Sequence, residues 1–229
     1  MNILNISAFV SLFIQLITGG IGAIGLTYNV HPNDKIVKDI LLSVLIVQFV
    51  EFLFYMYLVY KIIFDHISSS ITSQRYIDAI TTPIMLINFA IFFLYLGRRN
   101  NKEEDKKLDY REILKNEKFP FLLLIIANVF MLIFGYMGEI GSIGDALSTA
   151  ISFIPFAFIF KQLYSRYVAK DDILSQTLFY SIFFVWSLYG VAAVLPFAIK
   201  NTFYNILDLF SKNAFGLFLF FYLRKIQIK

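Results

Sequence analysis

Seven long apolar stretches constrain the fold of this chain more than any other feature of its sequence. A helix rises about 1.5 Å per residue, so crossing a hydrocarbon core of about 30 Å takes roughly 20 apolar residues. The stretches that meet this length are Ile3–Thr27, Ile40–Phe64, Ile71–Gly97, Phe119–Met137, Ile143–Tyr167, Ile173–Ile199 and Phe203–Leu223. They are too long for barrel strands and lack alternation of apolar and polar residues. The sequence therefore predicts an all-α membrane protein in which residues 1–229 form one domain, a seven-transmembrane helix bundle.

The composition excludes several other classes of protein. Hydrophobic residues make up 59% of the chain and the mean hydropathy is +0.71, whereas soluble domains are about 45–50% apolar. The chain has no cysteine, which rules out disulfides and thiolate metal sites, and its two histidines fall in different loops. We therefore expect an integral, multi-pass membrane protein that has no metal site and is not an enzyme.

The positions of lysine and arginine predict how the bundle lies in the membrane. Of the 20 basic residues, 16 fall on the side that the chain reaches after the first, third, fifth and seventh stretches. Because basic residues concentrate in cytoplasmic loops, we expect the N-terminus outside and the C-terminus in the cytoplasm. The basic loop from Arg98 to Lys118 also contains acidic residues, which favours a solvated loop over a nucleic-acid-binding segment.

Lys212 lies in the middle of the seventh apolar stretch, with Asp208 one helical turn before it. A charged lysine at this depth costs about 2.5 to 3.5 kcal/mol, so it is a functional hypothesis by default. The i, i+4 spacing places Asp208 on the same helix face. A buried lysine amine suits a Schiff base to an aldehyde, balanced by a nearby carboxylate. The alternative is a structural ion pair inside the bundle.

Three more ionisable residues fall inside the apolar stretches: Glu51 in the second, and Arg75 and Asp78 in the third. Arg75 and Asp78 are three apart, so we expect them to share a polar interior with Lys212 and Asp208. Glu51 stands alone on its helix. It is interpreted either as a neutral carboxyl that forms a hydrogen bond to a facing helix or as an ion-pathway residue.

Three motifs carry a resemblance to a known family. They are Asp208-Leu209-Phe210-Ser211-Lys212-Asn213-Ala214-Phe215-Gly216 in the seventh stretch, Trp186-Ser187-Leu188-Tyr189-Gly190 in the sixth, and Arg75-Tyr76-Ile77-Asp78 followed by Thr81-Thr82-Pro83 in the third. With seven helices and an outside N-terminus, essentially the whole chain resembles the microbial retinal-binding rhodopsins.

The resemblance implies roles for individual residues. Lys212 would carry all-trans retinal as a protonated Schiff base, with Asp78 and Asp208 as counterions and Arg75 in their charge network. Thr82 and Asn128 would link the third and fourth helices. The residues implied to line the retinal pocket are Tyr76, Thr82, Met131, Gly135, Ser148, Thr149, Trp186 and Tyr189. Such aromatic walls with a few polar groups suit a long apolar ligand.

The third stretch departs from the family pattern by one residue. Ala79 follows Asp78 where the family usually has a tryptophan, and Pro83 comes eight residues after Arg75 instead of nine. A missing residue turns everything beyond it by about 100° unless a local irregularity absorbs the change. The directions in which Asp78 and Thr82 point therefore depend on whether such an irregularity is present.

Other positions favour a channel over a pump. Asn88 occupies the place where an outward proton pump carries a carboxyl proton donor, and the approach to the seventh helix holds Lys200 without paired glutamates. Glu51 resembles a pore glutamate of light-gated cation channels, and this resemblance implies that Glu51 and Asn213 lie on an ion pathway. These features look most like the viral rhodopsins, which implies a light-gated cation channel.

Several expectations accompany this reading. The partners are retinal, monovalent cations or protons, and the lipid bilayer, which would be a host cell membrane if the chain is viral; a homo-oligomer stays open. The alternatives are a slow light-driven outward proton pump, a sensory photoreceptor and a helical transporter without a chromophore.

Overall fold

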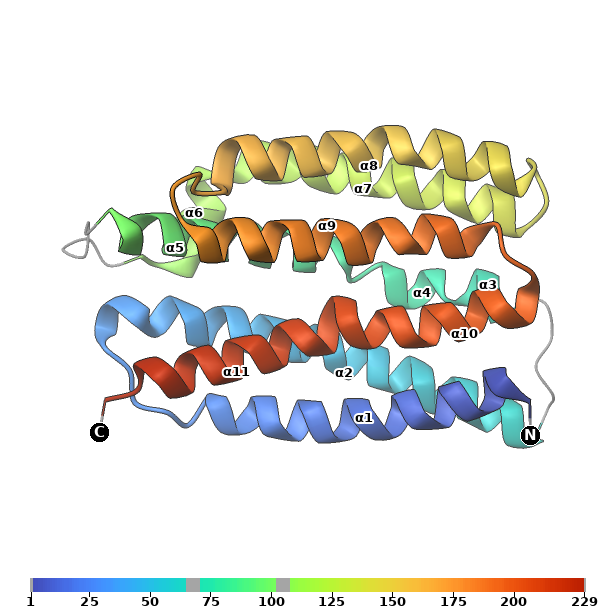
Figure 1. Cartoon of the computed structure of the whole chain (residues 1–229), viewed down its shortest axis with the longest axis horizontal. Coiled ribbons are helices and arrows are strands. Elements are labelled where there is room, and N and C mark those ends of the chain that lie inside the picture. Colours follow the sequence, from blue (N-terminus) through green and yellow to red (C-terminus); the bar gives the residue numbers. More distant parts are fainter. Residues whose placement is uncertain (1, 65–70, 102–107, 229) are drawn as a thin grey trace.

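The computed structural model describes residues 2–64, 71–101 and 108–228, and these are almost entirely helical. Seven helical spans lie side by side along the long axis, and the two chain ends lie at opposite ends of the bundle (Figure 1). The elements are α1 (Ile3–Gly25), α2 (Lys35–Phe64), α3 (Ile71–Gln74), α4 (Tyr76–Ala79), α5 (Thr82–Asn100), α6 (Tyr110–Asn116), α7 (Lys118–Glu139), α8 (Asp145–Tyr167), α9 (Ile173–Ala193), α10 (Phe197–Asp208), a π-helical turn (Leu209–Asn213) and α11 (Ala214–Ile226). The described residues contain no β-sheet, only an isolated bridge between Val30 and Gln227. The predicted all-α membrane fold of seven helices is confirmed.

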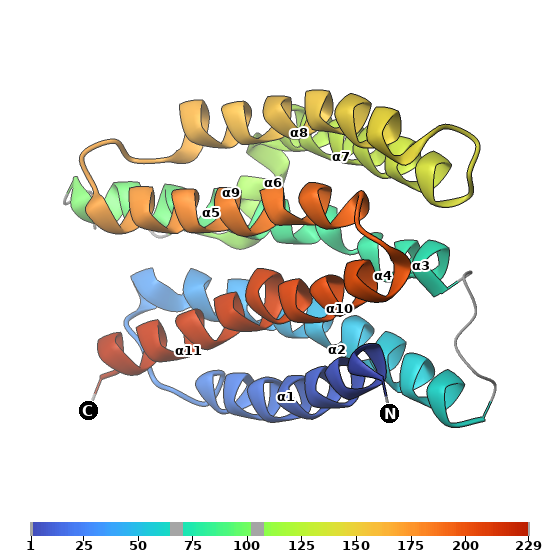
Figure 2. The same ribbon diagram turned by 45° about the vertical axis from the view of Figure 1, so that its right-hand side comes forward.

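Several helices that follow one another in the sequence pack side by side, as expected where short loops join long helices. α7 packs along α8, and α1 packs along both α2 and the last span made of α10 and α11. Figures 1 and 2 show α7, α8 and α9 on one side of the bundle and α1, α2, α10 and α11 on the other. We call the end at which α1 begins the N-terminal face, and the end that carries the α1–α2 connection the C-terminal face.

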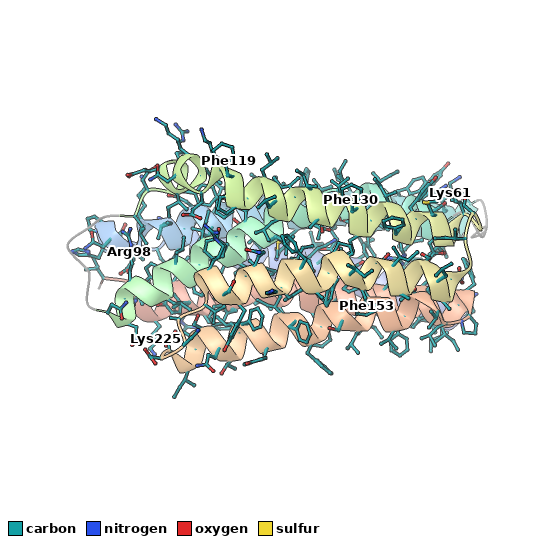
Figure 3. All side chains as sticks on the ribbon, turned by 90° about the horizontal axis from the view of Figure 1, so that it is seen from above. Lys61, Arg98, Phe119, Phe130, Phe153 and Lys225 are labelled. Atoms are coloured by element: carbon teal, nitrogen blue, oxygen red, sulfur yellow. The ribbon has the colours of Figure 1, made fainter. Side chains whose placement is uncertain are left out.

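The outer surface of the bundle is apolar along its length. Large side chains such as Phe13, Phe130, Ile154 and Phe184 are exposed, and Figure 3 shows side chains projecting from every helix, with Arg98 and Lys225 near one end and Lys61 near the other. An apolar belt between charged ends fits a protein that spans a bilayer.

Aromatic rings fill the interior of the half nearer the C-terminal face. The Phe89 ring contacts Phe215 edge-on at 4.7 Å and Trp186 at 5.9 Å between centroids. Phe92 and Leu219 are also buried there. Polar side chains are concentrated instead in the other half, around α10.

The sixth and seventh helices differ from the predicted bounds. The sixth helix ends at Ala193 instead of Ile199, and the seventh begins at Phe197 instead of Phe203. The reason is Pro196, which has no backbone N–H to continue a helix and instead directly precedes the first turn of α10. The second helix begins earlier than predicted, at Lys35, because its first turns are polar and lie at the end of the bundle.

The third span is broken into α3, α4 and α5, and the helix is overwound where the sequence is one residue short. The N–H of Thr81 donates to the carbonyl of Asp78 at 3.0 Å, and the N–H of Ile84 donates to that of Thr81 at 3.0 Å. These i to i−3 bonds are those of a 3₁₀-helix, which turns about 120° per residue instead of about 100°. Each such residue recovers about 20° of the 100° that one missing residue removes. Arg75 and Asp78 lie before Thr81, three residues apart, and both face the interior, with 8% and 5% of their surface exposed.

Candidate functional site

Lys212 lies within the π-helical turn Leu209–Asn213, where the last span widens by one residue. Ser211, Lys212 and Asn213 are consecutive and all buried, whereas a regular helix turns each successive residue by about 100°. Such π-helical turns occur frequently at functional sites. The irregularity brings three neighbouring polar side chains into the bundle interior.

Two carboxylates from other helices contact the Lys212 ammonium. It donates a hydrogen bond to Oδ2 of Asp78, and its Nζ lies 3.9 Å from Oε1 of Glu51. Glu51 is fully buried, and neither of its oxygens accepts a hydrogen bond from the described residues. Of the two interpretations of Glu51, the hydrogen bond to a facing helix is not formed among the described residues, and α2 instead presents Glu51 directly to the lysine.

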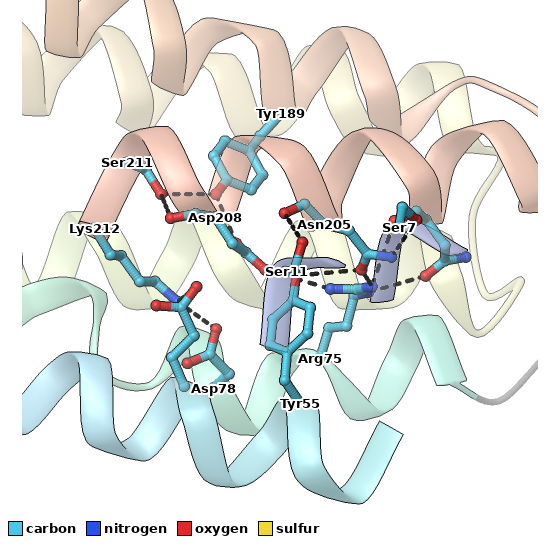
Figure 4. Close-up of polar contacts among 12 residues, drawn as sticks. Ser7, Ser11, Tyr55, Arg75, Asp78, Tyr189, Asn205, Asp208, Ser211 and Lys212 are labelled. Atoms are coloured by element: carbon cyan, nitrogen blue, oxygen red, sulfur yellow. Dashed lines mark hydrogen bonds and ion pairs between the residues drawn. The ribbon is translucent and has the colours of Figure 1, made fainter. Parts of the chain in front are cut away.

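Asp208 is held by three donors instead of by Lys212. The hydroxyls of Tyr55 and Tyr189 each donate to its carboxylate at 2.7 Å, and Arg75 approaches Oδ2 at 3.4 Å (Figure 4). The hydroxyl of Tyr189 also lies 2.8 Å from that of Ser211. The predicted group of Arg75, Asp78, Asp208 and Lys212 comes together, with Asp78 on the lysine and Asp208 on the arginine.

Arg75 extends toward the N-terminal face and is fixed there by two asparagines of α10. Its Nε donates to Oδ1 of Asn201 at 2.9 Å, and its Nη2 donates to Oδ1 of Asn205. The guanidinium also lies over the rings of Phe54, Tyr55 and Tyr204, at 5.6 to 5.8 Å from their centroids. Hydrogen bonds and ring contacts on all sides hold this buried cation in one orientation.

A line of buried polar side chains on α1 faces these residues. Ser11 donates to the Asn205 carbonyl at 2.9 Å, and Asn213 donates to Thr18 at 3.0 Å. Gln15 lies between them on the same face and its amide has no partner among the described residues. Sequence reasoning missed this line, although the i, i+4, i+8 and i+11 spacing of Ser7, Ser11, Gln15 and Thr18 was a visible signal.

One cavity of about 210 Å³ lies between the helices and is lined by Lys212. All eight residues predicted to line a retinal pocket line this cavity, namely Tyr76, Thr82, Met131, Gly135, Ser148, Thr149, Trp186 and Tyr189. Gly135 has no room for a side chain, because an added Cβ would lie 2.6 Å from the Tyr76 hydroxyl.

The expected link between Thr82 and Asn128 is not formed. Asn128 is fully buried, but neither atom of its side-chain amide has a hydrogen-bond partner among the described residues. Thr82 instead faces the cavity, because the 3₁₀-like turn that precedes it reorients the start of α5.

Comparison with known proteins identifies the family. Residues 6–226 match the family described as "Bacteriorhodopsin-like protein". The chain belongs to the bacteriorhodopsin-like family. A search of curated proteins finds no match by sequence.

Solved structures of this family share the fold over nearly the whole chain. The viral rhodopsin OLPVRII is similar with a TM-score of 0.80 at 28% identity, covering 99% of this chain and 100% of that one. A blue light-absorbing proteorhodopsin from Med12 follows with a TM-score of 0.71 at 21% identity, covering 98% of both chains. A light-driven proton pump from Leptosphaeria maculans gives 0.68 at 16% identity, covering 98% of this chain and 97% of that one.

Members of the bacteriorhodopsin-like family bind retinal, and the residues of this member fit it. The cavity is lined by Lys212 and by the aromatic side chains of Phe153, Trp186 and Tyr189. Apolar walls with a few polar groups at one end suit a long polyene that carries one reactive carbonyl. The protein is accordingly an integral, multi-pass membrane protein.

On the other side of Lys212, the path to the C-terminal face has no carboxyl at position 88. Asn88 is fully buried, donates to the Ser43 hydroxyl at 3.0 Å and accepts from the Tyr110 hydroxyl at 2.9 Å. Burial raises the pKa of Tyr110, so the hydroxyl stays a donor at neutral pH. Tyr110 belongs to α6, so the loop between the third and fourth spans reaches into the bundle here.

Proposed function

We propose that this protein is a light-gated cation channel in which Lys212 binds all-trans retinal as a protonated Schiff base. The observation that carries the proposal is the position of Lys212 in the wall of the aromatic cavity, in contact with Asp78 and Glu51. When bound, retinal would supply the light-driven isomerisation that starts the cycle. The charged side chains around Lys212 would stabilise the positive charge of the Schiff base and accept its proton.

Each charged residue has a part in this mechanism. Asp78 accepts the hydrogen bond of the lysine nitrogen and is the nearest acceptor for its proton. Asp208, fixed by Tyr55 and Tyr189, balances the charge of Arg75 and is the second counterion. A change of charge at Asp78 alters the field at Glu51, which has no hydrogen bond among the described residues to hold it.

The polar line between α1, α2 and the last span supports conduction of cations. Buried polar groups are normally hydrogen-bonded, but Glu51, Gln15 and Oδ1 of Asn213 have no partner in the described residues. Such groups are able to coordinate water or a cation once the helices separate. The carboxylate of Glu51 favours cations over anions.

A slow outward proton pump is the second candidate, because Asp78 lies directly on the lysine as a proton acceptor. Asn88 argues against a fast pump, since an amide cannot return a proton. A sensory photoreceptor is a third reading. The N-terminus is proposed to face the outside in all three.

Photocurrents decide between these functions. Cells that express the protein are given all-trans retinal and illuminated while the membrane voltage is stepped and the external cations are exchanged. A current that reverses at a potential following the cation gradient supports the channel. A current of fixed outward sign against the gradient establishes a pump, and a visible pigment without current indicates a sensor.

A further inference from the structure

At the N-terminal face, a buried lysine lies between two carboxylates from other helices. Lys200, in the first turn of α10, has its Nζ 3.1 and 3.2 Å from the two oxygens of Glu139 and 3.7 Å from Oδ2 of Asp145. Glu139 ends α7 and Asp145 begins α8. The three residues therefore tie three helices together at one point. The sequence around Lys200 has no paired glutamates, because its two acidic partners come from α7 and α8.

Two of the three residues, Glu139 and Asp145, line the cavity that contains Lys212, and we call the part of the cavity that they border its mouth. Lys200 is not part of the lining but contacts both of them. The side chain of Asp145 is 52% exposed, whereas those of Glu139 and Lys200 are 9% and 8% exposed. This gradient of exposure, from Asp145 to the buried pair, runs from the solvent into the cavity.

Neutralisation of the buried charge of Lys200 does not explain why the cluster contains two carboxylates. One carboxylate is enough to neutralise Lys200, but the cluster has two and a net charge of −1. Apart from Lys200, Lys61 is the basic residue that the sequence places at this face of the bundle and not within a span. The mouth is therefore negative when Lys200 withdraws, and it attracts cations while repelling anions.

We propose that Lys200, held by Glu139 and Asp145, is a gate that closes this mouth of the cavity. Its ammonium holds together the two carboxylates that line the mouth, and in this way it closes the route by which water and small solutes reach Lys212 from the N-terminal face. Release of the ammonium opens the path and leaves two carboxylates facing the opening. This inference rests on retinal attachment at Lys212 and not on whether the protein is a channel or a pump.

Hydroxylamine measures access to the lysine without any transport assay. It attacks the imine carbon, so that the retinal leaves as its oxime and the Lys212 amine is freed, and the visible band disappears. We expect Lys200→Met to bleach several-fold faster than the parent protein in the dark. Lys61→Met removes the same charge at the same face and is expected to bleach at the parent rate.

A double variant separates a gate from simple loosening of the helices. In Lys200→Met alone, Glu139 is left buried without its partner, which by itself destabilises the packing. Glu139→Gln combined with Lys200→Met removes both charges, so a gate predicts that fast bleaching persists, whereas loosening predicts a return to the parent rate. Lys200→Arg keeps the ion pair and should bleach slowly.

The visible band of each variant reports retinal attachment, so failure of the proposed function is distinguishable from failure of the gate. The gate is overturned if pigment forms and Lys200→Met bleaches at the parent rate, if Lys61→Met accelerates bleaching equally, or if the double variant returns to the parent rate.

Discussion

At the level of single residues, the position of Lys212 is stabilised by charges that come from distant parts of the sequence. Asp78 is 134 residues away and Glu51 lies on another helix, yet both contact the lysine nitrogen. A buried ammonium without such partners is strongly destabilising, whereas paired and hydrogen-bonded charges are tolerated. The same contacts place acceptors where a proton leaving the lysine nitrogen would need them.

Replacement of the lysine tests the attachment site. Lys212→Ala removes the amine that forms the imine, so we expect no visible absorption band after addition of all-trans retinal. The measurement is an absorption spectrum of the purified protein. Lys61→Ala, which lies outside the cavity, is the control and should keep the band. A full band in Lys212→Ala would contradict the assignment.

Replacement of Glu51 tests the ion pathway. Glu51→Gln keeps the size of the side chain but removes its charge, so we expect the pigment to form while the photocurrent changes several-fold or loses cation selectivity. The measurement is the reversal potential and amplitude under exchanged cations. Glu112→Gln, on the exposed surface of α6, makes the same change away from the lysine. Equal currents in both variants and the parent count against a pathway at Glu51.

The sequence identified the charged residues but not all of their contacts. The spacing of Asp208 and Lys212 and of Arg75 and Asp78 placed them on common helix faces, and the structure brings all four together. The contact of Glu51 could not be foreseen, because α2 is apolar on most sides. In a bilayer the lipid is as apolar as the core, so the facing of such a helix depends on its neighbours.

At the level of elements, length and hydropathy were sufficient to predict seven helices, but not their irregularities. The end of α9 could have been predicted from Pro196. The π-helical turn at Lys212 has no comparable local signal, whereas near Thr81 the sequence indicated a missing residue but not the 3₁₀ bonds that accompany it. Both irregularities form because several polar side chains must face the same interior, which is a constraint of the tertiary structure.

The overwound third span predicts an unusual tolerance to insertion. One alanine inserted between Ile80 and Thr81 restores the missing residue, so the 3₁₀ bonds are able to relax to α-helical ones. We expect this variant to form pigment with a thermal bleaching temperature within a few degrees of the parent. Absorption during a temperature ramp makes the comparison.

An insertion in the regular part of the same span provides the control. One alanine after Leu86 turns Asn88, Phe89 and Phe92 away from the interior by about 100°, and all three are buried in the parent. We expect little or no pigment from this variant. Similar loss of pigment from both insertions would show that the break near Thr81 does not absorb a residue.

At the level of the whole molecule, the two halves of the bundle differ in chemistry. Arg75, Asp78 and Glu139 line or adjoin the cavity toward the N-terminal face, whereas Phe89, Phe92 and Phe215 pack together toward the C-terminal face. In the proposed channel, ions would therefore meet a polar path on one side of Lys212 and a tightly packed aromatic barrier on the other. Conduction would then require separation of helices chiefly in the C-terminal half.

Which half of the bundle faces the cytoplasm depends on the orientation of the protein in the membrane. The 16 basic residues on the side of the C-terminal face predict that this face is cytoplasmic. An epitope added at the N-terminus should then be labelled by antibody on intact cells, and one at the C-terminus only after permeabilisation. The reverse pattern would place the Lys200 cluster in the cytoplasm, and cations entering the cell would then meet the aromatic barrier before the polar cavity.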